Sequence, residues 1–581
     1  MSGKLDAIRK MDLCPSVLNL YVSKYSFGYL LNDIFAGVKI FLLLAPVALA
    51  LAFFCGISPI QGTISCAIAA LIGSVMGGSK YQISSIALPI CVLTFEIMSK
   101  YQYKGLLYTS IFAGGMLVLY GTMRMSEVLK HISHSFISAL SVYVVLSIMV
   151  NQLQYIFGIS VIQSSQGLTE NFMLMIGSIE NITSQGAITT AIFIVPLIVL
   201  RVFFSGFFPF FAYIALGGIA AYLSDLGLLP GIIELKTVGK ELLTSHVIDN
   251  VFTISKTVPS QIFLAGTLNY AFAISLIIGT ETCFTTNIAA CITGDKKIQH
   301  NVELIATGIS NFISIACGGI FVSPNKTLSL KNIAFKSQTI ISILIVAILS
   351  YALILFGDII LRYTPIFCLS SILIVYAASE IIGKKITQYL GVKSNESYIF
   401  LLTFGMALYF GFIPATIVGF TISSILFAKR MMKIKDATVH TTRNHDSGAV
   451  EFMSNKNGFS NSMKIPRNVL NKIEVIQVTN VLFLNIAKVI EEELSNRGKF
   501  PSIIIIYFKN IPYIDEEGFL MLKQMVAKVT QKGAIVIISG TNGVLLDILQ
   551  QKAERDNEGD VYGYIVPNFR EAIEQSVKRM S

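Results

Sequence analysis

Apolar segments follow one another along most of this chain, from about Leu31 to Phe427. A membrane-spanning helix needs about 20 apolar residues, and segments of that kind recur here with only short polar interruptions. After the basic stretch Lys429–Lys435 the sequence changes to alternating strand and helix patterns. The sequence therefore predicts a polytopic α-helical membrane protein over residues 31–428, followed by a soluble α/β domain.

The low content of charged residues agrees with a chain that lies largely within a lipid bilayer. Only 13% of the 581 residues are charged and 54% are hydrophobic, whereas soluble proteins carry about 25% charged residues. The net charge of +10 is spread over short loops and the tail, with no basic face that interleaves aromatic residues. This distribution argues against a nucleic-acid partner and favours the lipid bilayer.

Catalytic and metal-binding patterns are missing from the sequence. Seven of the eight cysteines lie in apolar segments, without a CxxC pair or a His/Cys cluster at metal-ligand spacing. There is also no nucleophile–base pair and no nucleotide-binding loop. We therefore expect no metal, no cofactor and no enzymatic activity. Residues 1–30 lack the apolar core of a cleavable signal and are predicted to be a cytosolic segment.

About 14 spans are predicted. Two segments, Ser84–Met98 and Ser323–Phe335, are short and follow glycine pairs, and Tyr398–Phe427 is long enough for two helices broken around Gly411 to Pro414. The remaining spans are predicted near Ile34–Phe54, Ile60–Met76, Leu106–Thr122, Phe136–Leu153, Ala187–Phe204, Phe207–Leu223, Leu264–Ile278, Leu304–Ile320, Thr339–Phe356 and Ile366–Ile382.

An even number of spans places both termini on one side of the membrane. Lysine and arginine concentrate in cytoplasmic loops, and the basic loop residues fall on the side of the termini. We expect a plasma-membrane (inner-membrane) protein with both termini cytoplasmic and the Asp225–Gln261 loop outside. The basic loop residues are Arg124, Lys130, Lys296, Lys297, Lys331, Lys336, Lys384, Lys385 and Lys393.

The two short segments occupy corresponding places in the early and late groups of spans. Paired, glycine-interrupted short helices indicate a binding site near the bilayer midplane. The amino-terminal end of each half-helix offers unpaired N–H groups and about half a positive charge. Two such ends facing each other predict an anion site. The alternative is that the glycines only permit close helix packing.

Residues 465–581 alternate between strand and helix, which predicts a sheet covered by helices. The apolar strand Ser502–Phe508 is expected at its centre, buried on both faces. Residues 429–464 are predicted to be a basic stretch and linker, with a polar part at Asn444–Lys464. The other predicted elements are the strands Glu474–Val478, Ala534–Ser539 and Gly563–Val566, and the helices Leu484–Arg497, Glu516–Gln531, Gly543–Lys552 and Phe569–Arg579.

Several short motifs recur at specific spacings along nearly the whole chain. They are Ile34–Val38 with Ala45–Ala50, Gly56–Pro59 with Gly62, Gly77–Ser84, Asn301–Leu304 with Gly308, Asn311 and Gly318-Gly319, and Tyr513–Gly518. Together they resemble the sulfate permease (SulP) family, which carries a C-terminal STAS domain and whose animal relatives include prestin. The resemblance implies a seven-plus-seven inverted repeat with core and gate parts, a homodimer, and elevator-like movement of small anions.

The resemblance also implies a substrate site with several departures from the family pattern. Val47 stands where glutamine is frequent, Ser85-Ile86-Ala87 replaces Gly-Pro-Thr, and Asn325-Lys326-Thr327 replaces Ser-Arg-Ser. Lys326 keeps the positive charge without arginine's bidentate fork, or else extends to the aqueous face. The predicted substrate-binding residues are Val47, Ser84, Ser85, Ala87, Asn325, Lys326, Thr327 and Leu328.

Glu281 lies within an apolar helix and resembles the acidic residue of the family's eighth helix. An intramembrane carboxylate costs about 2.5 kcal/mol or more, so it normally faces a cavity or a partner. H⁺ or Na⁺ would satisfy it and would couple transport to a cation gradient. The alternative is a structural carboxylate that caps a broken helix or pairs with Lys326.

In the STAS loop Asp515–Gly518, Glu517 stands where stand-alone relatives have a phosphorylated Ser or Thr. Phosphorylation at this position is therefore not expected, although a cytosolic partner of the domain is. The sequence favours a secondary active transporter of small anions, of the sulfate, bicarbonate or dicarboxylate class. Two alternatives stay open, namely an exchanger or channel-like anion binder without cation coupling, and a membrane sensor that signals through the STAS domain.

Overall fold

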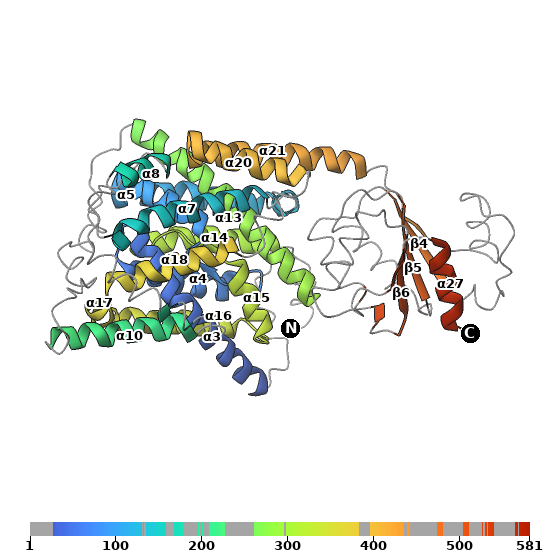
Figure 1. Ribbon diagram of the computed structural model, residues 1–581, viewed down its shortest axis with the longest axis horizontal. Helices are drawn as coiled ribbons and strands as arrows, with labels where there is room; N and C mark the ends of the chain where they lie inside the picture. The colour runs from blue at the N-terminus through green and yellow to red at the C-terminus, as the bar shows by residue number, and fades with distance from the viewer. Residues whose placement is uncertain are drawn as a thin grey trace, which may run out of the picture. The chain divides into compact units, whose positions relative to one another are not determined.

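The computed structural model (Figure 1) describes residues 27–130, 132, 135–157, 168–177, 196–197, 200, 208–226, 261–295, 298–382, 395–434, 439–441, 473–479, 503–509, 526, 529–530, 533–539, 564–566 and 569–580. The chain divides into two compact units, Met1–Phe427 and Ala428–Ser581. The first unit is helical, and the second contains a five-stranded sheet.

Among the described residues of the first unit, five helices are long and apolar enough to cross a membrane. They are α3 (Phe27–Phe54), α4 (Pro59–Met76), α5 (Leu88–Thr122), α7 (Ser135–Phe157) and α13 (Gln261–Thr293). Further apolar helices are α10 (Phe208–Asp225), α16 (Ile341–Leu355), α18 (Ile366–Ile382), α20 (Asn395–Phe410) and α21 (Phe412–Ile434). The remaining described helices are α6 (Ser126–Leu129), α8 (Leu168–Gly177), α14 (His300–Ala316), α15 (Lys326–Ala334) and α17 (Gly357–Tyr363).

Two predicted breaks are present in the structure. The predicted segments Ser84–Met98 and Leu106–Thr122 meet within α5 at Gln102, whose φ of 54° and ψ of −165° interrupt the helix. α20 and α21 are separated by Gly411 at φ +93°, a conformation that only glycine adopts readily. The predicted span Ala187–Phe204 and the loop Asp225–Gln261 lie almost entirely outside the described residues.

The predicted span Leu264–Ile278 is too short, because α13 continues unbroken to Thr293. Threonines make this part of the sequence look polar. Their hydroxyls, however, donate to carbonyls one turn back, from Thr282 to Ile278 (2.6 Å) and from Thr286 to Thr282 (2.8 Å). This bonding satisfies the hydroxyls inside the helix, so polar residues do not end it.

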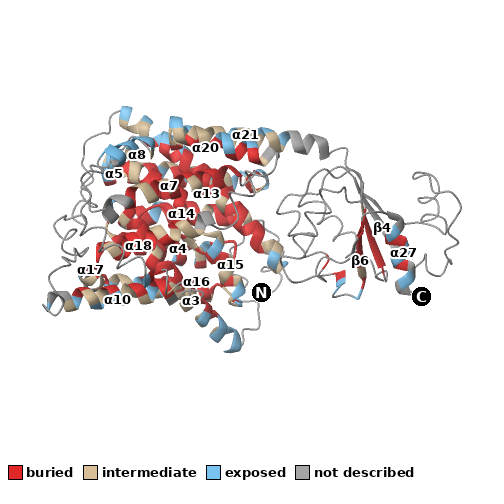
Figure 2. Ribbon diagram, viewed as in Figure 1, coloured by how far each residue is buried: buried red, intermediate tan, exposed pale blue. Residues whose placement is uncertain are grey.

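The helices of the first unit pack as two groups. In one group α14 packs on α5 and α4, α13 on α5, and α16 on α3 and α4. In the other, α7 packs on α18, α20 and α8, while α10 contacts α17 and α18. Buried residues concentrate where these helices face each other (Figure 2). α3 contacts both groups, through α18 and α10 on one side and α4 and α16 on the other.

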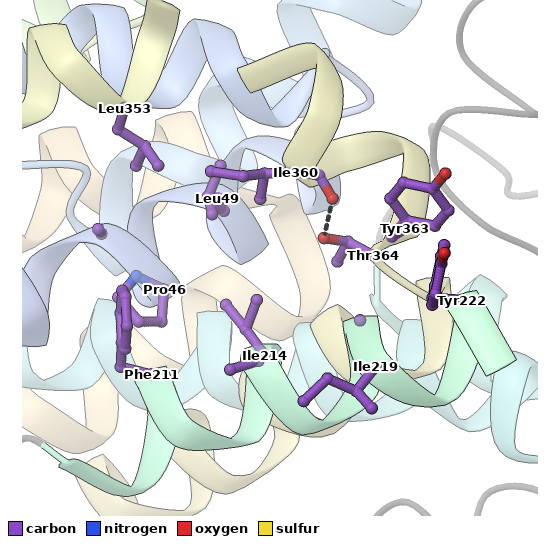
Figure 3. Close-up of a pocket in the computed structure, with 13 residues that line it drawn as sticks. Pro46, Leu49, Phe211, Ile214, Ile219, Tyr222, Leu353, Ile360, Tyr363 and Thr364 are labelled. Carbon is purple, nitrogen blue, oxygen red and sulfur yellow. Dashed lines mark hydrogen bonds between the residues drawn. The ribbon is translucent and has the colours of Figure 1, made fainter. Parts of the chain in front are cut away.

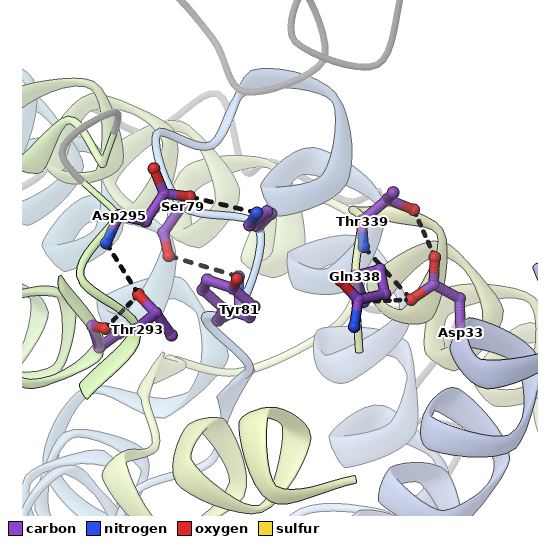
Figure 4. Close-up of polar contacts among 9 residues, drawn as sticks. Asp33, Ser79, Tyr81, Thr293, Asp295, Gln338 and Thr339 are labelled. Atoms are coloured by element: carbon purple, nitrogen blue, oxygen red, sulfur yellow. Dashed lines mark hydrogen bonds and ion pairs between the residues drawn. The ribbon is translucent and has the colours of Figure 1, made fainter. Parts of the chain in front are cut away.

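A buried carboxylate fixes the start of α3 against the segment before α16 (Figure 4). Asp33 Oδ1 accepts hydrogen bonds from the N–H groups of Gln338 (2.7 Å) and Thr339 (3.2 Å), and Oδ2 accepts one from the Thr339 hydroxyl (2.5 Å). A charged group buried in an apolar helix needs such partners. Asp33 therefore connects two segments about three hundred residues apart in the sequence.

The second unit contains a sheet with strand order β3-β4-β5-β6-β7. The strands are β3 (Val439–Thr441), β4 (Ile473–Thr479), β5 (Ile503–Lys509), β6 (Ile535–Ser539) and β7 (Tyr564–Val566), followed by helix α27 (Phe569–Met580). β5 pairs in parallel with β4 and β6, and Ile503 to Ile506 are at most 1% exposed. The prediction of a central, buried strand at Ser502–Phe508 is confirmed.

One strand of this sheet lies in the segment that was predicted to be basic stretch and linker. β3 pairs antiparallel with β4, with Val439 opposite Val478. Three residues are too few to show a strand periodicity, which is why the sequence did not reveal it. The linker Asn444–Lys464, the loop Asp515–Gly518, and the predicted helices Leu484–Arg497 and Gly543–Lys552 lie outside the described residues, as does most of Glu516–Gln531.

Candidate functional site

Two extended segments run between helix ends and pair with each other. β1 (Ser84–Ser85) and β2 (Ser323–Pro324) form a short antiparallel sheet in which Ser84 lies opposite Pro324 and Ser85 opposite Ser323. Next to it, the N–H of Asn325 donates to the Ile83 carbonyl (2.8 Å). The starts of the two short helical segments, which are half a chain apart in the sequence, therefore lie side by side.

The two helix starts differ in their chemistry. α5 begins at Leu88 after Ala87, which makes no side-chain capping bond, and a proline occupies the first turn. α15 begins at Lys326 after Asn325, whose Oδ1 accepts from the N–H of Leu328 (3.0 Å). Asn325 Nδ2 also donates to Ser85 Oγ (3.2 Å). Asn325 is thus both the cap of one helix and the side-chain link to the other segment.

A cavity of about 110 Å³ opens at this junction. Of the predicted substrate-binding residues, Val47, Ser85, Asn325, Thr327 and Leu328 line it, whereas Ser84, Ala87 and Lys326 do not. Its other lining residues are Leu43, Leu44, Ala48, Ile86, Phe210, Lys331, Tyr376 and Ser379. Phe210 belongs to α10, and Tyr376 and Ser379 belong to α18. The cavity therefore lies between the two helix groups.

Two lysines of α15 have different surroundings. Lys326 Nζ lies 4.8 Å from the centroid of the Phe284 ring on α13, a cation–π distance. Lys331 lines the cavity together with Thr327, because residues four apart share a helix face. The sequence marked Lys331 only as a basic loop residue, so its place in the cavity was missed.

Glu281 contacts β2 and is not among the residues that line the cavity. Its Oε2 accepts a short hydrogen bond from the hydroxyl of Ser323, the residue paired with Ser85. Glu281 is half-buried within the unbroken helix α13. Glu281 therefore does not end its own helix, and its bond to Ser323 joins it to the extended segment before α15.

Two buried side chains of α14 hold the two extended segments in place. Glu303 Oε2 accepts from the N–H of Ser79 (2.9 Å), and its Oε1 accepts from Gln82 Nε2 (2.9 Å). On the other segment, Asn311 bonds both the N–H (2.8 Å) and the carbonyl (3.0 Å) of Val322. Glu303 and Asn311 both belong to motifs of the family resemblance, which was the signal that marked them, although their roles were not predicted.

A larger cavity, about 410 Å³, lies between α3, α10, α16 and α17 (Figure 3). Apolar side chains such as Leu49, Ile214 and Leu353 dominate its lining. The hydroxyl of Thr364 donates to the Ile360 carbonyl (2.7 Å), as Figure 3 shows, and so is already bonded within the protein. An anion there would lose its hydration without compensation, and the smaller cavity is the better candidate for an anion site.

Metal-binding clusters of three or more His, Cys, Asp or Glu residues are not found among the residues that the structure describes. One surface ion pair joins the first extended segment to the end of α13, because Lys80 Nζ lies 3.2 Å from Asp295 Oδ2. The same part of the structure, with Ser79, Tyr81 and Thr293, is drawn in Figure 4.

Comparison with known proteins agrees with this architecture over the whole chain. The chain is 21% identical over 535 residues to "Putative sulfate transporter YvdB" of Bacillus subtilis (strain 168), covering 90% of this chain and 93% of that protein. The solved structure of SLC26A9 superposes with a TM-score of 0.62 at 15% identity, covering 100% of this chain and 94% of that one. The transmembrane domain of the cyanobacterial bicarbonate transporter BicA gives 0.54 at 18% identity, covering 69% and 98%.

Family profiles match both parts of the sequence. The sulfate permease family profile matches residues 30–403, and the STAS domain profile matches residues 464–556. The first match alone covers more than half of the chain. This protein therefore belongs to the sulfate permease family, a family of anion transporters rather than enzymes, and its carboxyl-terminal part is a STAS domain.

Proposed function

We propose that this protein is a secondary active transporter that moves a small oxyanion, of the sulfate or bicarbonate class, by an elevator-like mechanism. The observation that carries the proposal is the cavity at the paired segments β1 and β2. It combines polar side chains of Ser85, Asn325 and Thr327 with the positive ends of two helices. Neither helix start carries an acidic residue in its first turn that would repel an anion.

The cavity has room for a small anion. Its volume of about 110 Å³ is well above the minimum that holds one water molecule. The names of the relatives, sulfate and bicarbonate transporters, are the reason to place these two oxyanions first in the predicted class.

The elevator-like mechanism is supported by where the cavity lies. Its walls come from α3, α15 and the segment before α5 in one helix group, and from α10 and α18 in the other. Sliding of the first group along the second would carry Ser85, Asn325 and Thr327 together with the anion. The first group meets the second where α3 contacts α10 and α18 and where α5 contacts α7, and such sliding would occur along these contacts.

Coupling to H⁺ or Na⁺ is assigned to Glu281. Its carboxylate accepts the hydroxyl of Ser323, which is two residues from Asn325 and paired with Ser85. Neutralising the carboxylate would remove a negative charge from the group that bonds β2, next to the proposed anion site, and would favour anion binding. A cation bound at Glu281 and an anion in the cavity would therefore stabilise each other.

The test is radiolabelled uptake into proteoliposomes with an anion panel and imposed pH or Na⁺ gradients. The wild-type protein should accumulate one small oxyanion against its gradient when a cation gradient is present. Glu281→Gln keeps the hydrogen-bonding shape and removes the titratable group. This variant should lose gradient-driven accumulation while keeping homoexchange of the same anion. Unchanged accumulation in Glu281→Gln would show that Glu281 is not the coupling residue, whereas a wild-type protein that accumulates no anion under any cation gradient would leave exchange without cation coupling as the function.

The STAS domain is assigned a regulatory or scaffolding role through a cytosolic partner, in a homodimer whose termini are both cytoplasmic. The cavity residues all belong to the first compact unit. Because β3 belongs to the sheet, the informative truncation removes residues 436–581 rather than 465–581. Truncation should alter rate or trafficking and keep the ranking of anions. A changed ranking would assign the tail to selectivity.

A further inference from the structure

We propose that Lys331, rather than Lys326, is the side chain that supplies positive charge to the transported anion. The inference rests on the proposed anion site and names the residue that recognises the substrate there. The sequence motif points to Lys326, because this residue stands at the start of the half-helix. The contacts of the two lysines point instead to the second turn of α15.

Lys331 is placed on the cavity side of α15 by helix geometry. It follows Thr327 by four residues, and both residues line the cavity with Asn325. Lys331 carries the one full positive charge among the described lining residues. It is half-buried, so its attraction for an anion is screened less than on an open surface.

The described α18 residues that line the cavity carry no charge. They are Tyr376 and Ser379. The hydroxyl of Ser379 donates to the Tyr376 carbonyl (2.6 Å), so its one proton is used within the helix. Positive charge for an anion in the cavity therefore comes from the α15 side.

Lys326 is engaged elsewhere. Its ammonium lies 4.8 Å from the centroid of the Phe284 ring, an attraction that holds the side chain against α13. Reaching the cavity would require loss of this contact and rotation around the helix, because Lys326 and Thr327 point in directions about 100° apart. Lys326 therefore serves the packing of α15 on α13.

A different role for Lys331 makes a different prediction. A lysine near a membrane surface can extend its charge into water, with only its methylene stem packed in the protein. Its replacement by a neutral residue would then leave anion affinity unchanged. Anion titration of matched variants distinguishes the two roles directly.

The experiment uses the full-length protein in lipid nanodiscs, titrated calorimetrically with sulfate and with bicarbonate. Lys331→Gln should weaken sulfate binding about ten- to hundred-fold, the effect of losing a hydrogen bond to a charged group. Bicarbonate should lose less, because Coulomb attraction scales with the charge of the anion. The matched variant Lys326→Gln removes the same charge from the same helix and should change both affinities by less than about fivefold.

Charge and structural effects are separated by Lys331→Arg, which keeps the charge and should retain most of the sulfate affinity. Should Lys331→Gln fail to fold, the wild-type protein gives a second measurement. Saturating sulfate should protect Lys331, but not Lys326, from amine acetylation read by peptide mass spectrometry.

The proposal is overturned if Lys331→Gln binds sulfate like the wild type, if Lys326→Gln causes the larger loss, or if sulfate protects Lys326 instead. A wild-type protein that binds neither anion would contradict the proposed function itself, and that failure is visible before any variant is made.

Discussion

The amino-terminal ends of α5 and α15 lie side by side, and their residues differ. At the α5 start, Ala87 makes no side-chain capping bond, and Pro89 removes one of the amide donors of the first turn. At the α15 start, Asn325 caps the helix and also contacts Ser85. The first start therefore contributes backbone dipole and the Ser85 hydroxyl to the cavity, whereas the second contributes the Asn325 and Thr327 side chains.

Both starts are held by a carboxylate together with neutral groups. In the segment before α5, the buried Glu303 carboxylate bonds Ser79 and Gln82, and Ser329 Oγ accepts from Ile83 N–H (2.9 Å). In the segment before α15, the Glu281 carboxylate accepts from the Ser323 hydroxyl, Ser65 Oγ accepts from Ile320 N–H (2.6 Å), and Asn311 bonds Val322. We infer that loss of the buried Glu303 is costly to stability, whereas damage at the second start changes anion recognition more.

The largest effect is expected from Glu303→Ala. This substitution leaves the buried N–H of Ser79 and the amide of Gln82 without their acceptor, and each lost hydrogen bond to a charged group costs about 1.5–3 kcal/mol. We expect a loss of about 3 kcal/mol or more, seen as poor membrane insertion or a strongly lowered apparent Tm in detergent.

Glu303→Gln is the matched control. Its Oε1 can still accept from Ser79, and its Nε2 can donate to Gln82 once that amide turns over, since Gln82 Oε1 is buried without a hydrogen bond. This variant should remain close to wild type in Tm. If Ala and Gln variants were equally stable, the carboxylate would not support the first segment.

Replacing glycines of the two segments by alanine is expected to lower the apparent Tm by a smaller amount. A Cβ on Gly78 would lie 2.1 Å from the Gln299 carbonyl oxygen, whereas a Cβ on Gly318 meets nothing within 4 Å. Gly318 has φ of +92°, which costs a residue with a side chain about 1 kcal/mol. Gly78→Ala should therefore lower the apparent Tm more than Gly318→Ala does, because backbone must move to relieve the clash. The reverse order would contradict the view that the first segment is the more tightly packed.

The architecture was largely predictable because its signals are long. Apolar runs predicted α4 and α18 almost to the residue, and an uninterrupted run of isoleucines predicted the buried strand β5. Elements were missed or shortened where the pattern was short or where polar side chains interrupted it. β3 has three residues, and the threonines of α13 looked polar although they bond within the helix.

The candidate site was predictable in outline and not in detail. The glycine-interrupted pattern located both helix starts, and the structure brings Ser85 and Asn325 together there. Which lysine reaches the cavity depends on the rotation of α15 about its axis, and contacts far apart in the sequence, such as Ser329 with Ile83 and Lys326 with Phe284, set that rotation. A helix of nine residues is too short for hydrophobic periodicity to predict that rotation.

At the second helix start, Asn325→Ala should reduce stability moderately and anion affinity clearly. Loss of a helix cap costs about 1 kcal/mol, and the same change removes the amide that lines the cavity. Asn325→Asp keeps the capping oxygen but places a negative charge beside the anion. We expect Asn325→Asp to keep its Tm and to bind sulfate still more weakly than Asn325→Ala. Equal affinities in the two variants would show that Asn325 acts only as a cap.

The smallest effect is expected from Ser85→Ala on the first segment. Its hydroxyl accepts one hydrogen bond from Asn325 Nδ2 at 3.2 Å and donates only weakly to Ile86 (3.5 Å). The Asn325 amide that loses this partner still faces the cavity, where water or the anion can accept its hydrogen bond. We expect a change of about 1 kcal/mol or less in stability and a smaller loss of sulfate affinity than in Asn325→Ala.

A double-mutant cycle between Ser85→Ala and Asn325→Ala measures how far the two starts depend on each other. The two side chains share one hydrogen bond, so the effects on sulfate affinity should couple by about 0.5–1 kcal/mol. Ser85→Cys keeps the side-chain volume with a weaker hydrogen-bonding group and serves as the control for simple loss of volume. If Ser85→Ala weakened sulfate binding as much as Asn325→Ala, the first start would contribute as much side-chain recognition as the second. The two helix starts would then differ in stability and not in anion recognition.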